Sequence, residues 1–271
     1  MKITSRDGTT IAFDVQGAGP ALILVDGALT TRRSQWRPEL VALLAPHFTV
    51  YGYDRRGRGE STDTKPYAVE REIDDIDELI GYAGGRAFLH GQSSGGCLAL
   101  LTARELGPGR VAGVASYEAP WNDDPTVQPA WSEYLRGLDK ALANGRRGDA
   151  VALFMRFVGN PPEQVDAMRD SPYWPSLEAL APTLAYDHAG IMSPIIAVPR
   201  QKLAQVTAPA VAICGGQSPA YMCATARTIS ETVRHGAWRT IAGQRHAVEA
   251  SAIAPVLIES FGAMVKDTRA A

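Results

Sequence analysis

FLHGQSSGGCLAL, at residues 88–100, joins one short apolar run to another through a turn of small residues. The turn holds the pattern G-x-S-x-G, with Gly91, Ser93 and Gly95 at its fixed positions. When a strand precedes this pattern and a helix follows it, the sharp turn exposes the serine at the helix N-terminus. Backbone N–H groups and the helix dipole favour a developing negative charge there. We therefore predict a nucleophilic Ser93; the alternative is a glycine-rich strand–helix turn without chemistry.

The chain on both sides of this turn alternates strand-like and helix-like segments. Continuous apolar runs such as ALILVDG at 21–27 are typical of parallel strands covered on both faces. The alternation predicts an α/β fold: a mostly parallel central sheet of about eight strands, with helices on both faces. The expected strands that we can assign are 9–17, 21–27, 48–54, 86–91, 110–118, 208–216 and 237–243, and the expected helices are 36–45, 67–85, 93–109, 221–236 and 254–267.

Between residues 121 and 206 this alternation stops. Helical segments there are separated by Pro, Gly and Asn. We predict a helical lid inserted after the sixth strand, over the strand ends where ligands bind in such sheets. The domain organisation is then a core of residues 1–120 and 207–271 with a lid of residues 121–206. Trp121 and Met192 are expected to line a largely apolar substrate pocket.

A nucleophilic serine at such a turn needs a base and an oxyanion hole. The nucleophile, the acid and the histidine follow one another in that order in chains of this kind. His246 comes after the last expected strand and fits the base. The backbone N–H of Ser94 would donate to the oxyanion, and the loop after strand 21–27 would supply a second donor at Ala28. The other histidines have structural interpretations: His47 in a loop, His90 inside a strand, His188 in the lid and His235 at a helix end.

Five stretches in this order resemble the α/β-hydrolase superfamily, in its single-lid branch of serine esterases, lactonases and thioesterases. They cover nearly the whole length: LILVDGALTTR (22–32), YGYDRRGRGEST (51–62), LHGQSSGGCLAL (89–100), APAVAICGG (208–216) and IAGQRHAVEAS (241–251). The resemblance implies attack by serine on an ester, lactone or thioester without a cofactor. It also implies a structural role for Asp54 and Arg55. A serine at the turn argues against the haloalkane dehalogenase and epoxide hydrolase branches, whose nucleophile is an aspartate.

Two positions depart from the family pattern. Asp26-Gly27 stands where His-Gly is usual, and Asp26 either repels a developing oxyanion or hydrogen-bonds to backbone. The segment ICGGQSP, residues 213–219, lacks the carboxylate that usually follows this strand. That acid fixes the tautomer of the histidine, and its neutral replacement can cost ~10⁴ in turnover.

Glu118 is our choice for the missing acid. It follows the preceding strand at the same edge of the sheet, as the acid does in some branches of the superfamily. Its neighbours are apolar, so its charge needs a partner or a substrate. The alternatives are Asp123, Asp124, Asp187, Glu249, or a serine–histidine dyad aided by Gln217 or Ser218.

Composition limits the remaining possibilities. The 271 residues are 45% hydrophobic and 21% charged, with a formal net charge of −2. This predicts no nucleic-acid or membrane partner, and no apolar run reaches the ~18 residues of a membrane span. The N-terminus carries no apolar signal stretch, and Cys97, Cys214 and Cys223 show no metal spacing. We therefore expect a cytoplasmic protein with reduced thiols and no metal; its oligomeric state is left open.

The function predicted from these residues is hydrolysis of a carboxylic ester, lactone or thioester through an acyl-enzyme at Ser93. Two alternatives keep the fold. One is a lyase, isomerase or cyclase that uses His246 as a proton shuttle, suggested by Asp26 and the missing acid. The other is a ligand-binding protein on a hydrolase scaffold, since fold does not fix function.

Overall fold

An open, twisted sheet forms the centre of the computed structural model, which describes residues 1–35, 37–192 and 194–270, with side chains for all of these except 189 and 266–270. Within these residues the sheet has eight strands in the order β1-β2-β4-β3-β5-β6-β7-β8. β2 is antiparallel to both of its neighbours, and the pairs from β4 to β8 are parallel. The strands are β1 (Lys2–Thr4), β2 (Thr10–Gln16), β3 (Ala21–Val25), β4 (Thr49–Tyr53), β5 (Ala87–Gln92), β6 (Val111–Tyr117), β7 (Ala210–Gly215) and β8 (Gly236–Ile241).

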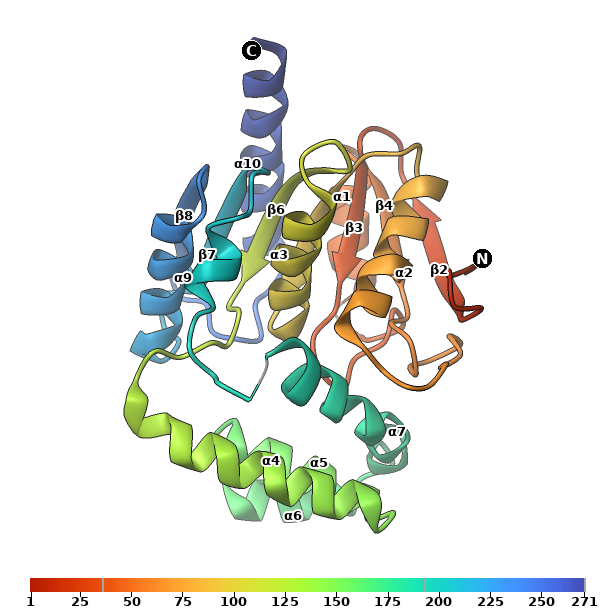
Figure 1. Cartoon of the computed structure of the whole chain (residues 1–271), viewed down its shortest axis with the longest axis vertical. Helices are drawn as coiled ribbons and strands as arrows, with labels where there is room; N and C mark the ends of the chain where they lie inside the picture. Colours follow the sequence, from red (N-terminus) through yellow and green to blue (C-terminus); the bar gives the residue numbers. More distant parts are fainter. Residues whose placement is uncertain (36, 193, 271) are drawn as a thin grey trace.

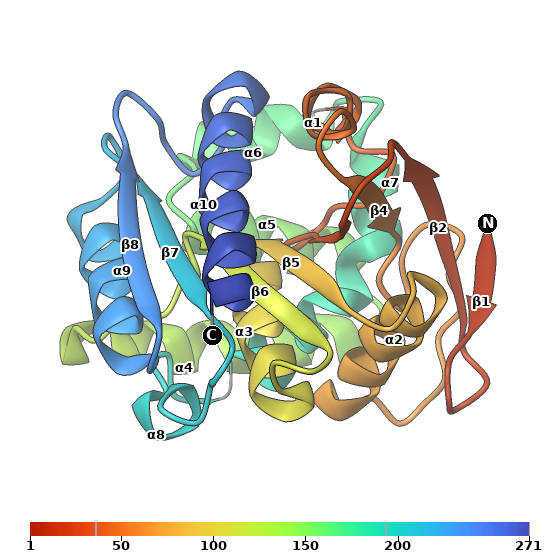
Figure 2. The ribbon, with the colours of Figure 1, turned by 90° about the horizontal axis from the view of Figure 1, so that it is seen from above.

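Helices cover both faces of this sheet, as Figures 1 and 2 show. One face carries α1 (Arg37–Leu44) and α10 (Ala250–Ala270), and the other carries α2 (Val69–Tyr82), α3 (Ser94–Leu106) and α9 (Ala220–Thr232). All five residues of β3 are buried, because side chains on both faces meet a helix layer. The predicted fold class, a mostly parallel sheet between two helix layers, is confirmed.

A few element bounds differ from the predicted ones. β1 has no predicted counterpart, because three residues are too few to show a strand period. The closing helix α10 begins at Ala250, four residues before the predicted start, and Pro255 lies inside it. Trp36, at the predicted start of α1, lies outside the described residues.

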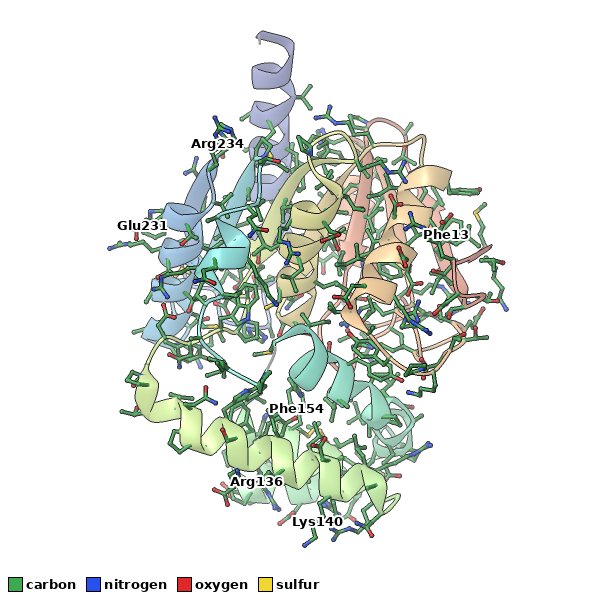
Figure 3. The ribbon with its side chains drawn as sticks, viewed as in Figure 1. Phe13, Arg136, Lys140, Phe154, Glu231 and Arg234 are labelled. Atoms are coloured by element: carbon green, nitrogen blue, oxygen red, sulfur yellow. A yellow bond between two sulfur atoms is a disulfide. The ribbon has the colours of Figure 1, made fainter. Side chains whose placement is uncertain are left out.

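Residues 121–206, which we call the cap segment, connect β6 to β7. Its helices lie beyond the carboxyl ends of the central strands (Figure 1). Phe154 points toward the core, while Arg136 and Lys140 point away from it (Figure 3). Opening and closing of this segment as a lid stays a prediction. The helices and short helical turns of the cap segment are η1 (Pro125–Val127), α4 (Gln128–Ala143), α5 (Arg147–Phe157), α6 (Pro162–Arg169), α7 (Trp174–Leu180), η2 (Ala181–Thr183), η3 (Tyr186–Ile191) and α8 (Arg200–Leu203).

The cysteines depart from the expected reduced state. Cys214 and Cys223 form a disulfide with their Cα atoms 5.2 Å apart, while Cys97 is a buried free thiol. The expectation of three reduced thiols is therefore wrong for two of them. The reason is local: a short loop joins the end of β7 to the start of α9, which brings two cysteines nine positions apart into bonding range.

The structure bears separately on membrane spanning and on the cellular compartment. Among the described residues, no helix has both the length and the apolar character needed to cross a bilayer. The cytoplasmic location stays a prediction, and the disulfide belongs to a type of bond that persists mainly in oxidising compartments.

Candidate active site

Ser93 lies at the turn between β5 and α3, where the sequence places it. Its backbone has φ 56° and ψ −130°, a conformation that costs a side-chain-bearing residue free energy. A side chain on Gly91 would collide with the backbone of Gly95, and one on Gly95 would collide with the carbonyl of Val25. Both glycines are thus required by the close approach of strand and helix, and the glycine-rich turn is a tight elbow.

Backbone strain gathers around this elbow. Among the described residues, the non-glycine residues with positive φ are Leu29 at 53°, Ser93 at 56° and Glu118 at 46°. Leu29 follows the predicted oxyanion residue Ala28, and Glu118 is the predicted acid. Strained backbone persists only where the surroundings impose it, and it clusters at functional sites. The strained positions therefore coincide with the site expected from the sequence.

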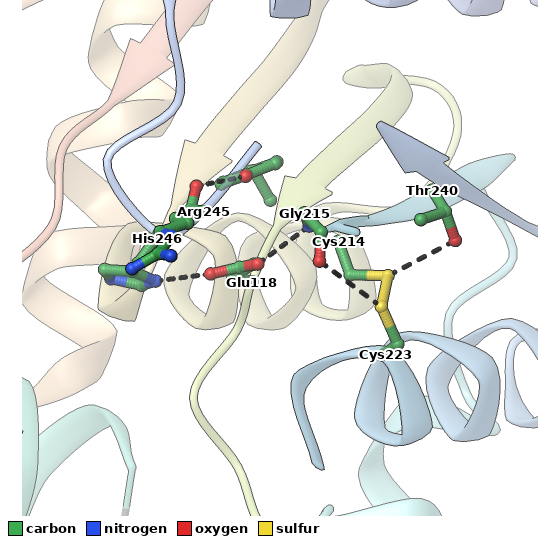
Figure 4. Close-up of a disulfide and its surroundings, with 8 residues drawn as sticks. Glu118, Cys214, Gly215, Cys223, Thr240, Arg245 and His246 are labelled. Carbon is green, nitrogen blue, oxygen red and sulfur yellow. Dashed lines mark hydrogen bonds and ion pairs between the residues drawn. A yellow bond between two sulfur atoms is a disulfide. The ribbon is translucent and has the colours of Figure 1, made fainter. Parts of the chain in front are cut away.

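His246 and Glu118 lie in contact (Figure 4). The Nδ1 atom of His246 is 2.7 Å from Oε2 of Glu118. The other carboxylate oxygen of Glu118 accepts the backbone N–H of Gly215 at 2.8 Å. The Gln92 side chain donates to the carbonyl oxygen of His246 at 3.0 Å, which ties the histidine loop to the residue before Ser93. Two residues 128 positions apart in sequence thus come together at the carboxyl edge of the sheet.

Electrostatics favour an ionised Glu118. The residue is 1% exposed, and burial alone would raise the pKa of its carboxyl group. Hydrogen bonds to the carboxylate, the one from His246 first among them, together with the charge of His246 outweigh burial, so the pKa lies below its ordinary value. A carboxylate that stays charged near neutral pH holds a proton on Nδ1 of His246 and leaves Nε2 as the basic nitrogen.

The other candidate acids lie elsewhere. Asp187 is buried among arginines, Asp123 pairs with Arg200, Asp124 accepts the N–H of Thr126, and Glu249 lies near Gln244. Asp124 is the N-cap of the helical turn η1, a role that the short acidic side chain suits.

The loop after β3 runs beside Ser93. A side chain on Gly27 would come within 2.9 Å of the Ser93 Cβ atom. Among the described residues, no acceptor takes the backbone N–H of Ala28 or of Ser94. Two N–H groups near the serine are therefore open to a ligand, as an oxyanion hole requires.

Within the described residues, the carboxylate of Asp26 follows neither expectation. It is paired with a cation, and it accepts no hydrogen bond from a backbone N–H group. Its buried side chain pairs with Arg37 at the start of α1. Burial raises the pKa of Asp26, while the charge of Arg37 acts in the opposite direction. An ion pair on the α1 side of the sheet accounts for this departure from the family pattern.

Trp121 and Met192 are both buried within the main apolar core, at 1% and 3% exposure. Their role as pocket residues stays a prediction. An open cleft of about 790 Å³ lies between the loop after β3 and α7. This cleft was not predicted, because the loop after β3 and the helix α7 that line it come together only in the fold. Its residues include Leu29, Thr31, Arg33, Ser34, Tyr173 and Leu177.

Strain at the elbow leads to a stability prediction. The free energy of unfolding of Ser93→Gly is expected to exceed that of Ser93→Ala by about 1 kcal/mol, because glycine adopts this backbone conformation without the steric penalty of a Cβ atom. Both variants lack the hydroxyl, so urea unfolding of the pair measures the backbone alone. The same pair at Ser260, inside α10, should differ with the opposite sign. Equal stability of the two Ser93 variants would show that the elbow is not strained.

The sheet order, the elbow and the cap between β6 and β7 define an α/β-hydrolase fold. A model of the alpha/beta hydrolase family matches residues 17–258 of this chain. The chain therefore belongs to the alpha/beta hydrolase family.

Individual relatives and solved structures resemble this chain over most of its length. The chain is 26% identical over 229 residues to 3-oxoadipate enol-lactonase 1 of Acinetobacter baylyi, covering 81% of this chain and 80% of the relative. A solved α/β hydrolase from Sphaerobacter thermophilus is 45% identical, with a TM-score of 0.86 over 96% of this chain and 100% of that one. A thermophilic esterase from Thermogutta terrifontis has a TM-score of 0.72 at 21% identity, over 97% of this chain and 98% of the esterase. The last of these likenesses concerns the fold alone.

Proposed function

We propose that this chain is a serine hydrolase that cleaves a carboxylic ester, lactone or thioester through an acyl-enzyme at Ser93. The observation that carries the proposal is the 2.7 Å contact between Nδ1 of His246 and the buried carboxylate of Glu118. A histidine held in this way serves as a base toward a serine, and the serine is at a strained elbow tied to the same loop. The likeness to an enol-lactonase supports the same class of reaction.

The proposed reaction uses only groups of the chain and water. Nε2 of His246 takes the proton of the Ser93 hydroxyl as Oγ attacks the carbonyl carbon. The N–H groups of Ala28 and Ser94 hold the oxyanion of the tetrahedral intermediate. The leaving alcohol or thiol receives the proton from His246 when its bond to carbon breaks. Water then repeats the sequence, releasing the acid and restoring Ser93, without a cofactor or metal.

The substrate we propose is a small, largely apolar molecule. The cleft beside Leu29 has a volume in the range of ligand sites, and its lining combines apolar side chains with several polar ones and with Arg33. Leu177 and Tyr173 supply apolar surface there, and Thr31 and Ser34 supply hydroxyl groups. We propose neither a nucleic-acid nor a membrane partner.

Labelling with a fluorophosphonate tests the proposal. We expect the folded protein to form a covalent adduct at Ser93, located by peptide mass spectrometry, because the probe reacts with serines activated by a base. The adduct should be absent in Ser93→Ala and strongly reduced in His246→Ala. Ser260→Ala is the matched control and should label like the parent.

Absence of labelling would argue against an activated serine. If the folded parent stays unlabelled at high probe excess and hydrolyses no ester, lactone or thioester, the proposal is wrong. The non-hydrolytic and ligand-binding alternatives would then remain. Two features suggested these alternatives, Asp26 and the missing acid. Against them stand the ion pair of Asp26 with Arg37 and the contact of Glu118 with His246.

A further inference from the structure

A buried carboxylate of the cap segment connects the two proposed oxyanion donors. Asp187, in η3, is fully buried. Its Oδ1 atom accepts from the Ser94 hydroxyl at 2.8 Å and from Arg55 at 2.6 Å, and its Oδ2 atom accepts from Arg58 at 2.7 Å. Asp187 lies more than ninety positions from Ser94 in the chain, so the two residues meet only when the cap segment packs on the core.

The two arginines continue from Asp187 to the loop after β3. Arg58 donates to the carbonyl oxygen of Gly27, and Arg55 donates to the carbonyl oxygen of Asp26 at 3.1 Å. The carbonyl of Gly27 and the N–H of Ala28 belong to one planar peptide unit and point in opposite directions. Holding the carbonyl toward Arg58 therefore fixes the direction of the Ala28 N–H. A charged donor on the carbonyl also polarises that peptide unit and strengthens its N–H as a donor.

The same carboxylate anchors the other donor. The Ser94 hydroxyl is held by Asp187, and Ser94 is the first residue of α3. Its backbone N–H is the second proposed oxyanion donor. One carboxylate thus restrains both peptide units, directly at Ser94 and through Arg58 at Ala28.

We propose that Asp187, acting through Arg58 and the Ser94 hydroxyl, is the positioning residue that aligns the oxyanion hole. The inference rests on the proposed hydrolase function and adds a role for the cap segment. Asp187 touches no reacting atom. Through Asp187 the cap segment helps to stabilise the transition state, because the N–H donors that Asp187 orients act only when the oxyanion forms.

Asp187→Asn is the direct test, with p-nitrophenyl butyrate as the probe ester. We expect kcat per folded molecule to fall about 10²-fold, the lower range for loss of one oxyanion donor, while KM changes little. Circular dichroism at the assay temperature gives the folded fraction. Asp123→Asn is the matched control, since Asp123 is a cap aspartate that also binds an arginine, Arg200, away from this cluster; its kcat should equal that of the parent.

A second measurement distinguishes a role of Asp187 in aligning the oxyanion hole from a role in folding alone. Exchanging the ester carbonyl oxygen for sulfur in a thionoester weakens its hydrogen bonds to the oxyanion hole. The parent should therefore prefer the oxygen ester strongly, and Asp187→Asn should lose much of that preference. Glu118→Gln should slow both esters by the same factor, because it acts on His246 and leaves the hole intact. Ser94→Ala keeps its N–H but loses the hydroxyl, and should shift the preference in the same direction as Asp187→Asn.

Each result decides something. If Asp187→Asn is less stable but keeps the parental kcat and oxygen preference in its folded fraction, Asp187 only ties the cap to the core and the inference is wrong. If Asp187→Asn does not fold, the Ser94→Ala preference decides the question. If the parent hydrolyses neither ester and does not label at Ser93, the proposed function fails and the inference fails with it.

Discussion

Ser93→Ala is expected to lower kcat for p-nitrophenyl butyrate by on the order of 10⁵–10⁶, the range seen when a nucleophile acting with a histidine is removed. The hydroxyl is the atom that bonds to the acyl group, and no other described group at the elbow can replace it. The Ser94 hydroxyl is the nearest rival in sequence, but it is buried and donates to Asp187. The backbone of the elbow should persist, because alanine has the same steric needs as serine at this φ.

Turnover of the double variant distinguishes the mechanism further. Ser93→Ala with His246→Ala should be no slower than Ser93→Ala alone, because the two groups act as one unit and their effects do not add. Ser260→Ala is the control for handling and purity. Residual turnover of Ser93→Ala within 10-fold of the parent would place the nucleophile elsewhere.

Local chemistry made the elbow predictable. The requirement for glycine at Gly91 comes from contacts with the turn and helix that follow it, so it appears in neighbouring sequence positions. Gly95 instead meets the carbonyl of Val25 in β3, but it holds its fixed place in the same local G-x-S-x-G pattern. The apolar stripe of Val69, Ile73, Ile76 and Ile80 in α2 is local in the same sense: the three isoleucines are buried, and Val69 is partly buried. Patterns of this kind specify an element and its buried face.

Contacts between distant segments were harder to predict from the sequence. Glu118 could be proposed because β6 and β7 are neighbours and end at one edge of the sheet, but its contact with His246 depends on a loop 128 positions away. Nothing in the sequence around Asp187 indicates that it meets Ser94, and we considered it only as an alternative acid. The disulfide between Cys214 and Cys223 was missed because an odd cysteine count favours reduced thiols. The contacts of Glu118 and Asp187 depend on how the cap and the loops return to the sheet, which periodicity does not encode, whereas the disulfide spans a short local loop.

Glu118 offers the sharpest test of how the histidine is held. Its Oε1 atom accepts the Gly215 N–H at 2.8 Å, so an atom in this place must be an acceptor. In Glu118→Gln the amide oxygen is therefore expected to face Gly215, and the amide NH₂ to face Nδ1 of His246. Nδ1 then accepts a hydrogen bond, and the proton of the neutral ring moves to Nε2. Nε2, the nitrogen that should take the Ser93 proton, then already carries a proton and cannot act as the base.

The expected effect follows from this tautomer. We expect kcat for Glu118→Gln to fall about 10⁴-fold, as when the buried acid of a serine–histidine pair is neutralised. Glu249→Gln is the matched control, because Glu249 is exposed and only three positions from His246; it should keep the parental rate. A loss of less than 10-fold in Glu118→Gln would favour the dyad aided by Gln217 or Ser218.

Stability of the same variant should depend on pH in a defined direction. The pKa of Glu118 lies below its ordinary value in the folded protein, so its ionisation stabilises the fold above the unfolded pKa of about 4.3. This contribution is lost as the pH falls through the lower, folded pKa. The Tm of the parent should therefore exceed that of Glu118→Gln at neutral pH, and the gap should narrow on acidification. A gap that widens in acid would mean that burial dominates and that the carboxyl group is held protonated, which would leave His246 without a charged partner.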